Sequence, residues 1–292
     1  MEIINRRQRM TSVLRKLRRN SDTTVGLVPT MGALHEGHLS LVREARRRCD
    51  HVIVSVFVNP AQFDDPGDYK IYPRQLTQDT ALLTDYNVDY IFAPTPEEIY
   101  PPGFATYVHV EGLSDPMEGA HRPGHFRGVA TVVTVLLNLI RPDFAFFGQK
   151  DAQQTVIVRR LVRDLGFETE VIVLPTVREA SGLALSSRNA RLDQSQRAAA
   201  AALYRGLQAA ETAYRRGERD ARRLVEQVRT EITREPRFAL EYVQVTDAET
   251  LRPVEKLDDR PALLALAARI GGTRLIDNIL LAPPRPSPDD RE

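Results

Sequence analysis

Two segments of the chain combine glycine with basic side chains in positions where the phosphates of a nucleotide could bind. Residues 29–38 read PTMGALHEGH, and residues 147–154 read FGQKDAQQ. Each follows an apolar run of strand length and precedes a helical pattern, so each predicts a loop that opens a helix. Backbone N–H groups and the positive end of a helix attract anions there, and His35, His38 and Lys150 add side-chain donors. Together the two segments predict anion sites suited to a nucleoside triphosphate.

Less specific interpretations of these two segments stay open. His35 and His38 could be solvent-facing loop histidines or two ligands of a metal, although no third ligand stands nearby as a zinc site would require. Asp151 could hold Mg²⁺ or a ribose hydroxyl, or it could cap the helix that begins at this point. Capping and ligand binding are compatible, so neither interpretation excludes the triphosphate.

Three further segments carry polar side chains that could complete a site. Asn59 and Gln62 follow an apolar run, where the carboxyl end of a parallel strand would place a substrate, but an ordinary Asn-Pro turn is equally compatible. Residues 122–128 (RPGHFRG) could close over a site or simply connect two elements. Residues 185–189 (LSSRN) offer two hydroxyls and an arginine, a compact anion clamp that is also common elsewhere.

The elements needed to position these segments alternate between strand and helix over residues 1–176. Short apolar runs predict strands at residues 24–29, 51–58, 88–92, 144–147 and 170–174, and helical periodicity predicts helices at residues 37–48, 79–86, 128–140 and 151–165. Such alternation is typical of a mostly parallel sheet covered on both faces. We therefore predict an α/β, Rossmann-like nucleotide-binding domain.

The pattern changes after residue 176. Residues 193–216 and 220–234 predict two helices, the first with a capping-box start at Asp193 and Gln196. Residues 240–245, 262–268 and 274–281 predict three strands of a small sheet. We therefore predict a smaller α+β domain over residues 177–282, whereas residues 283–292 are rich in proline and charge and are predicted to be disordered.

The composition of the 292-residue chain argues against several classes of protein. Its 40 basic and 39 acidic residues give a net charge of +1, without the basic excess that is typical of nucleic-acid-binding proteins. No apolar stretch reaches the roughly 20 residues of a membrane span. The basic N-terminal segment lacks the apolar block of an export signal and predicts a surface helix instead. Cys49 is the only cysteine, which fits a reducing, cytoplasmic location.

Taken in order along the chain, these motifs resemble those of pantothenate synthetases, which belong to the adenylyl-transferring enzymes with a His-x-Gly-His motif. The resemblance rests on PTMGALHEGH, FVNPAQF, YPR, RPGHFRGVATVV, FGQKDAQQ, LALSSRN and TRLIDN, and it extends from about residue 24 to residue 281. It implies ATP-dependent ligation of (R)-pantoate and β-alanine through a pantoyl-adenylate, with release of AMP and diphosphate. It also implies Mg²⁺ dependence, a homodimer, and a smaller C-terminal lid domain.

The resemblance further implies, position by position, which residues bind the substrates. Those expected to contact ATP are Met31, Gly32, Ala33, Leu34, His35, Glu36, Gly37, His38, Gly148, Gln149, Lys150, Asp151, Val177, Leu185, Ser186, Ser187 and Arg188. Those expected around pantoate are Gln62 and Gln154, with Gln62 also near β-alanine and with Asn59 and Tyr72 lining the same pocket. Asp79 would lie near Mg²⁺, and His38 matches the histidine to which the family's proton-donor role is assigned.

Adenylation chemistry suits these side chains. A carboxylate is ionised at pH 7, so it needs no general base to attack ATP, but the negative charge of the departing diphosphate requires cations. We assign the stabilisation of that negative charge to His35, His38, Lys150, Arg188 and Mg²⁺, and we expect the hydroxyls of residues 186–187 to donate hydrogen bonds to phosphate oxygens. The acceptor of the proton that the attacking amine loses is not evident from the sequence.

Three positions depart from the family pattern. Leu185 stands where some relatives have methionine, Ser181 replaces a frequent aspartate, and Val135 replaces a frequent lysine. The first is a hydrophobic exchange of similar size. The other two lie outside the matched catalytic positions, so they bear on local charge rather than on the reaction.

Two other function classes compete with the ligase. One is another enzyme with the same motif, such as a nucleotidyltransferase or an aminoacyl-tRNA synthetase, although the C-terminal part is too short and too neutral for the latter. The other is a nucleotide-binding regulator without activity, which the intact His38, Lys150 and Arg188 argue against.

Overall fold

The computed structural model describes residues 1–19 and 22–282, and the expected disordered tail at 283–292 lies outside the described residues. The chain forms two compact units. The first contains residues 1–177 and 185–187, and the second contains residues 178–184 and the chain from residue 188 onward. Among the described residues, the helices are all too short or too polar to cross a membrane.

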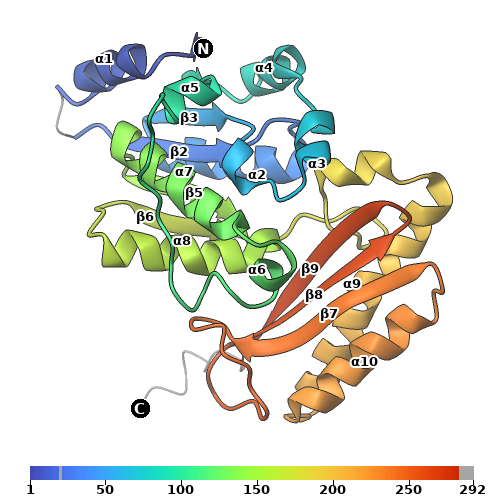
Figure 1. Cartoon of the computed structure of the whole chain (residues 1–292). Helices are drawn as coiled ribbons and strands as arrows, with labels where there is room; N and C mark the ends of the chain where they lie inside the picture. The colour runs from blue at the N-terminus through green and yellow to red at the C-terminus, as the bar shows by residue number, and fades with distance from the viewer. Residues whose placement is uncertain (20–21, 283–292) are drawn as a thin grey trace. The chain divides into compact units, whose positions relative to one another are not determined.

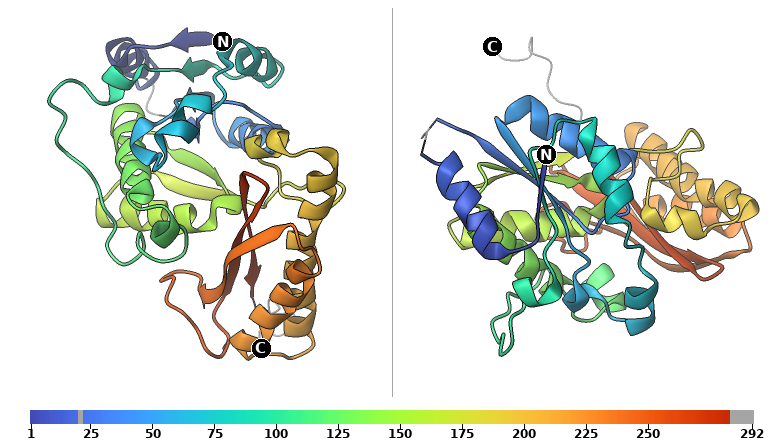
Figure 2. Two further views of the ribbon diagram at one scale, coloured as in Figure 1. Left: turned by 45° about the vertical axis from the view of Figure 1, so that its right-hand side comes forward. Right: turned by 90° about the horizontal axis from the view of Figure 1, so that it is seen from above.

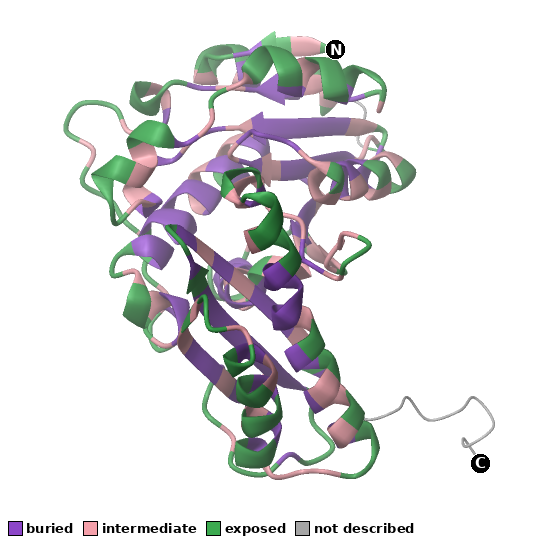
Figure 3. Ribbon diagram, turned by 90° about the vertical axis from the view of Figure 1, so that its right-hand side faces the viewer, coloured by how far each residue is buried: buried purple, intermediate pink, exposed green. Residues whose placement is uncertain are grey.

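The first unit is built on a six-stranded parallel sheet (Figure 1). Its strand order is β1-β4-β3-β2-β5-β6. The strands are β1 (Glu2–Ile4), β2 (Val25–Thr30), β3 (His51–Val56), β4 (Tyr90–Phe92), β5 (Phe144–Gly148) and β6 (Glu170–Leu174). Except for the edge strands β1 and β6, the strands are mostly buried runs of apolar residues, as is typical of parallel strands covered on both faces (Figure 3).

Helices follow most of these strands. The main ones are α1 (Arg7–Leu17), α2 (Glu36–Arg48), α4 (Leu76–Thr84), α7 (His125–Ile140) and α8 (Ala152–Asp164), with short helices α3 (Pro66–Ile71), α5 (Pro96–Ile99) and α6 (Glu118–His121). Helix α2 packs over β2, β3 and β5, whereas α7 and α8 lie side by side (Figure 1). Short 3₁₀ turns η1 (Pro60–Gln62) and η2 (Gln149–Asp151) follow β3 and β5.

The strand order places a topological switch between β2 and β5. From β2 the chain proceeds outward through β3 and β4, and then returns to place β5 on the other side of β2. The pairs between these strands are Gly26 with Phe144 and Leu27 with Ala145, whereas β2 runs on to Thr30 and β5 to Gly148. In open parallel sheets the crevice at such a point, beyond the carboxyl ends of the strands, is where ligands bind.

The second unit has an α+β fold, in which two helices pack against an antiparallel sheet. Antiparallel strands β7 (Phe238–Asp247), β8 (Ala262–Ile270) and β9 (Thr273–Leu281) form a sheet in that order. Helices α9 (Gln194–Arg215) and α10 (Ala221–Thr233) pack against each other and against this sheet (Figure 2). Asp193 caps α9 by accepting the N–H of Gln196, the capping box that the sequence predicts. A 3₁₀ turn, η3 (Ser187–Arg191), precedes α9.

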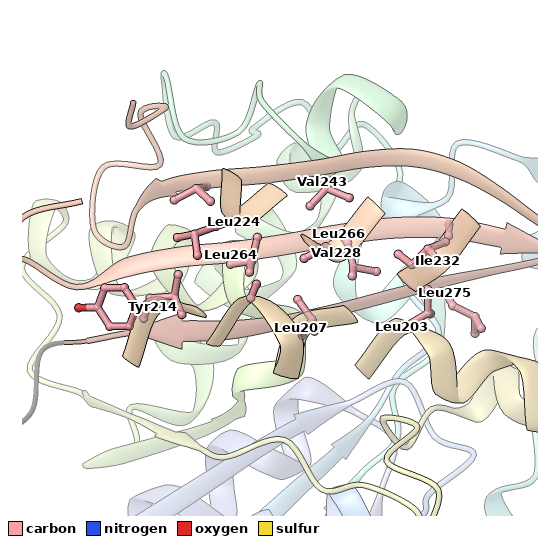
Figure 4. Close-up of a cluster of buried hydrophobic side chains, with 14 of the residues drawn as sticks. Leu203, Leu207, Tyr214, Leu224, Val228, Ile232, Val243, Leu264, Leu266 and Leu275 are labelled. Atoms are coloured by element: carbon pink, nitrogen blue, oxygen red, sulfur yellow. The ribbon is translucent and has the colours of Figure 1, made fainter. Parts of the chain in front are cut away.

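The core of the second unit lies between the two helices and the sheet (Figure 4). Its buried side chains come from one face of each helix and from all three strands, and they include Leu203, Leu207, Leu224, Val228, Ile232, Val243, Leu264, Leu266 and Leu275. The apolar residues of α10 recur at Ala221, Leu224, Val228 and Ile232, a helical spacing that explains why this segment folds as an amphipathic helix.

Candidate active site

The loop after β2 is fixed by a buried carboxylate. The N–H of Ala33 donates to Asp79 Oδ2 at 3.1 Å and the N–H of Leu34 donates to Asp79 Oδ1 at 2.9 Å, while Asp79 itself is 0% exposed. The N–H of Gly32 donates to Thr30 Oγ1 at 3.1 Å. Gly32 and Ala33 both have left-handed backbone angles, with φ of 77° and 51°. The turn is therefore an unusual backbone conformation that Asp79 stabilises from the neighbouring helix α4.

His35 and His38 cap helix α2 reciprocally. The N–H of Gly37 donates to His35 Nδ1 at 3.1 Å, and the N–H of His35 donates to His38 Nδ1 at 3.3 Å. The two rings lie 4.1 Å apart between their centroids. Because Nδ1 accepts in both rings, we assign the proton of each neutral imidazole to Nε2. Each ring therefore offers one Nε2–H donor.

Burial keeps both histidines neutral at pH 7. It lowers the pKa of His35 to about 4, with a further contribution from the positive charge of Lys150 and an opposing one from Asp151. It lowers the pKa of His38 to about 3, where His35 and Lys150 add to the decrease and Asp151 opposes it. The same charged pair acts on both rings, so the loop after β2 and the turn after β5 form one electrostatic unit.

These contacts change two expectations for the phosphate site. The N–H groups of Gly32, Ala33, Leu34, His35 and Gly37 already donate within the chain, so they are not the free donors expected at this helix start. The histidines are also neutral donors rather than cations, because burial disfavours the charged imidazolium. What the loop offers an anion is therefore two imidazole N–H groups beside an ammonium.

The turn after β5 carries that ammonium. Gly148 ends the strand, residues 149–151 form the turn η2, and α8 begins at Ala152. The Lys150 side chain is 19% exposed and its Nζ lies 3.6 Å from Asp151 Oδ1, whose side chain is 49% exposed. Gln154 lies in the first turn of α8 and is half-buried. A lysine held beside two neutral imidazoles is a point charge suited to phosphate oxygens.

Asn59 and Gln62 lie beyond the carboxyl end of β3 and contact the same loop. Asn59 Nδ2 donates to Gln62 Oε1 at 3.0 Å, and Gln62 Nε2 lies 3.1 Å from Met31 Sδ. Asn59 is 1% exposed and Gln62 is 8% exposed. Gln62, expected to contact pantoate, and Asn59, expected to line the same pocket, are therefore brought together with the segment that follows β2.

The backbone of Gln62 is held by Arg122, just before α7, and by His125, the first residue of α7. His125 Nδ1 lies 2.8 Å from the Gln62 carbonyl oxygen, and an Arg122 guanidinium nitrogen donates to the same oxygen at 3.2 Å. Burial lowers the pKa of His125 to about 4, with the Arg122 charge adding to the decrease, so the ring is neutral and its Nδ1–H donates. Gly128 in α7 approaches so closely that an added Cβ would lie 2.2 Å from the Ala61 carbonyl oxygen.

The strap, defined as residues 177–187, contains four residues of the first unit that are expected to contact ATP: Val177, Leu185, Ser186 and Ser187. The Leu185 N–H donates to the Val177 carbonyl at 3.0 Å, and a Cβ built on Gly37 would lie 4.0 Å from Leu185 Cβ. Ser187 Oγ lies 3.4 Å from the hydroxyl of Tyr72. Leu185 and Ser187 therefore lie beside the His-x-Gly-His loop and Tyr72, respectively.

Residues 178–184 and Arg188 belong to the second unit. Arg178 donates to both oxygens of Asp277, at 2.6 and 2.9 Å, and its guanidinium carbon lies 3.8 Å from the Tyr204 ring centroid. Asn189 Nδ2 donates to the Ala184 carbonyl at 3.0 Å. The TRLIDN motif thus contributes a buried carboxylate that anchors the start of the strap.

One residue of the expected ATP set and one departure from the family pattern make contacts within the chain. Glu36 is exposed and forms an ion pair with Arg43 on its own helix. Ser181, a departure from the family pattern, accepts the N–H of Leu183 at 3.4 Å, a contact that a carboxylate could also make.

The described side chains do not form a binding site for a resident divalent metal ion. Among residues 1–19 and 22–282, no cluster of three or more His, Cys, Asp or Glu could hold one. Asp79, the expected neighbour of Mg²⁺, uses both oxygens to accept backbone N–H groups and is fully buried. Because Mg²⁺ commonly binds through substrate phosphates and one or two carboxylates, these residues fit an ion that arrives with a nucleotide better than a preformed metal site.

Three groups of this region make contacts that the sequence motifs did not reveal, although two of them, His125 and Gln153, belong to segments that the sequence analysis singled out. The Tyr100 hydroxyl donates to Asn59 Oδ1, and His125 donates to the Gln62 carbonyl oxygen as described above. Gln153 donates to the carbonyls of Leu113 and Pro116, at 2.9 and 2.8 Å, and so fixes the loop before α6. Their partners lie between 35 and 63 residues away in sequence, which no local spacing reveals.

Comparison with known proteins gives a consistent result. The family model described as Pantoate-beta-alanine ligase matches residues 2–280. A pantothenate synthetase from Pelotomaculum thermopropionicum is 53% identical over 263 residues, covering 90% of this chain and 93% of the relative. The solved pantothenate synthetase of Thermus thermophilus superposes with a TM-score of 0.90 at 45% identity, covering 97% of this chain and 100% of its own. A pantoate-β-alanine ligase from Francisella tularensis, solved with β-γ ATP and β-alanine, gives 0.78 at 36% identity, covering 96% and 98%.

Proposed function

Because the chain belongs to the pantoate–β-alanine ligase family, we propose that it condenses (R)-pantoate with β-alanine in an ATP-dependent reaction that yields pantothenate, AMP and diphosphate. The observation that carries the proposal is the convergence of two segments at the β2–β5 switch point, where Lys150 and Asp151 act on His35 and His38. A cationic donor set at the carboxyl ends of parallel strands is where a triphosphate would bind.

In the first step the pantoate carboxylate attacks the α-phosphorus of ATP, and the bond to the bridging oxygen of diphosphate breaks. The nucleophile is ionised at pH 7, so the residues need only orient the reactants and stabilise the departing charge. We assign the stabilisation to the Lys150 ammonium and to the Nε2–H groups of His35 and His38. Neutral imidazoles donate hydrogen bonds here without requiring a proton transfer.

The remaining ATP contacts are proposed from the family resemblance together with their placement. Met31 and Gly148 stand at the ends of β2 and β5, and Leu185 lies against Gly37. The Ser187 hydroxyl, near that of Tyr72, would donate to a phosphate oxygen. Arg188 is proposed as a further cationic ligand.

Pantoate is proposed to bind through Gln62 and Gln154. Gln62 is held at its backbone carbonyl and at its side-chain oxygen, which leaves its amide NH₂ beside a thioether, a weak acceptor. An NH₂ in that position can donate to a carboxylate or hydroxyl oxygen of the acid. The proposal for Gln154 rests on its position one residue beyond the buried Gln153 in the first turn of α8.

In the second step the amine of β-alanine attacks the acyl carbon, the bond to the AMP oxygen breaks, and AMP leaves as an anion. The amine loses one proton in this step. Neither His35 nor His38 is free to accept it at Nδ1, because both Nδ1 atoms already accept backbone N–H groups. Their Nε2 atoms carry protons and can only donate in the neutral state.

Mg²⁺, a homodimer and a cytoplasmic location complete the proposal. When bound, Mg²⁺ would neutralise part of the triphosphate charge. It would be held chiefly by phosphate oxygens, and Asp151, a half-exposed carboxylate on η2, would supply a further ligand. The homodimer and the location are proposed from the resemblance and, for the location, from the single buried Cys49.

Product analysis tests this function. The purified protein incubated with ATP, Mg²⁺, pantoate and β-alanine is expected to form pantothenate, AMP and diphosphate in equal amounts. Omission of either acid or amine should abolish pantothenate. Formation of ADP and phosphate, or turnover without pantoate, would contradict the proposal.

A further inference from the structure

The orientation of the Gln62 side-chain amide is set by a chain of hydrogen bonds that starts at Tyr100. The Tyr100 hydroxyl donates to Asn59 Oδ1 at 2.7 Å, and Asn59 Nδ2 donates to Gln62 Oε1 at 3.0 Å. We infer that Tyr100 and Asn59 are positioning residues that hold the Gln62 NH₂ toward the substrate. The inference rests on the proposed binding of pantoate by Gln62.

Two backbone groups determine which terminal atom of the Asn59 side-chain amide is oxygen and which is nitrogen. One of its terminal atoms lies 3.3 Å from the Ala61 N–H, which can only donate, so that atom is oxygen. The other lies 3.1 Å from the Gly128 carbonyl oxygen, which can only accept, so that atom is nitrogen. The orientation of Asn59 therefore follows from groups that have a single hydrogen-bonding role.

Asn59 has no hydrogen-bonding capacity left for a ligand. Its oxygen accepts from Tyr100 and Ala61, and its NH₂ donates to Gln62 and Gly128, which fills two acceptor and two donor positions. Its exposed fraction of 1% also keeps it away from a substrate. Asn59 thus acts on the reaction through Gln62 rather than by direct contact, in contrast to the pocket-lining role expected from the sequence.

The same reasoning determines the orientation of the Gln62 side-chain amide. Since Asn59 Nδ2 donates, the Gln62 atom that it meets must be Oε1, and Nε2 then occupies the opposite side. There it lies 3.1 Å from Met31 Sδ, a weak acceptor that a substrate oxygen could replace. An inverted amide would place two donors opposite each other at Asn59 and would present an oxygen to an anionic substrate.

Tyr100 is itself held in place. Its ring contacts Phe104 edge-on, with centroids 5.0 Å apart, and Phe57 at 6.3 Å. Burial raises the pKa of Tyr100, so the hydroxyl keeps its proton and donates. Without this hydroxyl, Asn59 Oδ1 would keep only the longer contact to Ala61. The Ala61 N–H and the Gly128 carbonyl would still set the orientation of Asn59, but its side chain would be held less firmly, and the Gln62 NH₂ would occupy its donating position for less of the time.

The test compares Tyr100→Phe with Tyr107→Phe as a matched control. Tyr107 belongs to the same row of rings, at 5.5 Å from Phe104, and its ring is 44% exposed. Tyr100→Phe is expected to raise the KM for pantoate about fivefold, the size of one neutral hydrogen bond, with ATP affinity unchanged. Tyr107→Phe should change neither quantity.

A double-mutant cycle separates positioning from general damage. In a Gln62→Ala background the effect of Tyr100→Phe on pantoate KM should disappear, because no amide is left to orient. Asn59→Asp, which places an acceptor opposite Gln62 Oε1, should raise pantoate KM by more than about tenfold.

Two results would overturn the inference. One is an unchanged pantoate KM in Tyr100→Phe, and the other is an effect of equal size in the Gln62→Ala background. Absence of pantoate-dependent turnover in the unmodified protein would instead overturn the proposed function, and the inference with it.

Discussion

Replacing Asp79 with asparagine distinguishes a backbone clamp from a metal ligand. In the structure each carboxylate oxygen accepts one N–H, from Ala33 at 3.1 Å and from Leu34 at 2.9 Å. Asparagine keeps one oxygen and replaces the other with NH₂, so one of these N–H groups meets a donor. The turn that carries Gly32 and Ala33 at positive φ should then lose its fixed geometry.

The size of the effect follows from two opposing contributions. Leaving a buried donor without an acceptor costs about 1–3 kcal/mol. Burial also raises the pKa of Asp79, which means that its charge is itself costly, and removing the charge recovers part of that cost. We therefore expect ATP affinity to fall about tenfold, or ~1.4 kcal/mol, while the free energy of unfolding falls by about 1 kcal/mol or less.

Calorimetric titration of ATP at several Mg²⁺ concentrations measures this effect. Asp85→Asn is the control, because Asp85 is exposed at the end of the same helix and should leave ATP affinity unchanged. If Asp79 is a clamp, the loss in Asp79→Asn persists at every Mg²⁺ concentration. Recovery of affinity with added Mg²⁺ would make Asp79 a metal ligand, and an unchanged affinity would reject the clamp.

Three further variants probe charge, pH dependence and the second unit. Lys150→Ala should slow adenylate formation by about 10²-fold or more, measured by single-turnover kinetics, because a transition-state charge contact is lost; a normal rate would remove Lys150 from the site. The folded-state pKa of His125, about 4, lies below its unfolded value of about 6.5, so stability falls as pH decreases through this interval. Between pH 7 and pH 5, the free energy of unfolding measured by urea titration should therefore fall by about 2 kcal/mol less in His125→Asn than in the unmodified protein. An identical pH profile of the two proteins would contradict the neutral buried ring. Asp277→Ala should destabilise the second unit by about 3 kcal/mol in urea unfolding, since it leaves Arg178 partly buried without its carboxylate; an exposed control, Asp258→Ala, should cost much less.

The parallel sheet was predictable because its strands are short apolar runs between helical patterns. Five of the six strands of the first unit and all three of the second lie where the sequence places them, with ends that shift by a few residues. The exception is β1, where only Ile4 is buried and the pairing partner, β4, lies far along the chain. A three-residue edge strand gives no periodicity to detect.

The placement of the two glycine-containing motifs at strand ends was also predictable, but the charge states of their histidines were not. The motifs at residues 29–38 and 147–154 mark the ends of β2 and β5. Whether a histidine is charged depends on burial by segments that are distant in sequence, so local spacing could not show that His35 and His38 are neutral. One signal was available, since a spacing of three residues at a helix start is that of a capping box.

The positioning roles that we infer around Gln62 required the folded structure. Asn59 was placed correctly beyond a strand, but the positioning role that we infer for it depends on contacts with Tyr100 and Gly128, which are 41 and 69 residues away. No spacing rule links such distant positions. A polar residue that follows a strand therefore indicates where a site lies, and only its hydrogen-bond partners show whether it touches the substrate.

Exchange of labelled diphosphate into ATP tests the adenylation mechanism most directly. In the proposed mechanism the carboxylate of pantoate is the first nucleophile, and the donor set of His35, His38 and Lys150 stabilises the departing diphosphate. Exchange should therefore require pantoate and Mg²⁺ but proceed without β-alanine, and it should fall in Lys150→Ala. Exchange that depends on β-alanine would contradict formation of an acyl-adenylate before the amine binds.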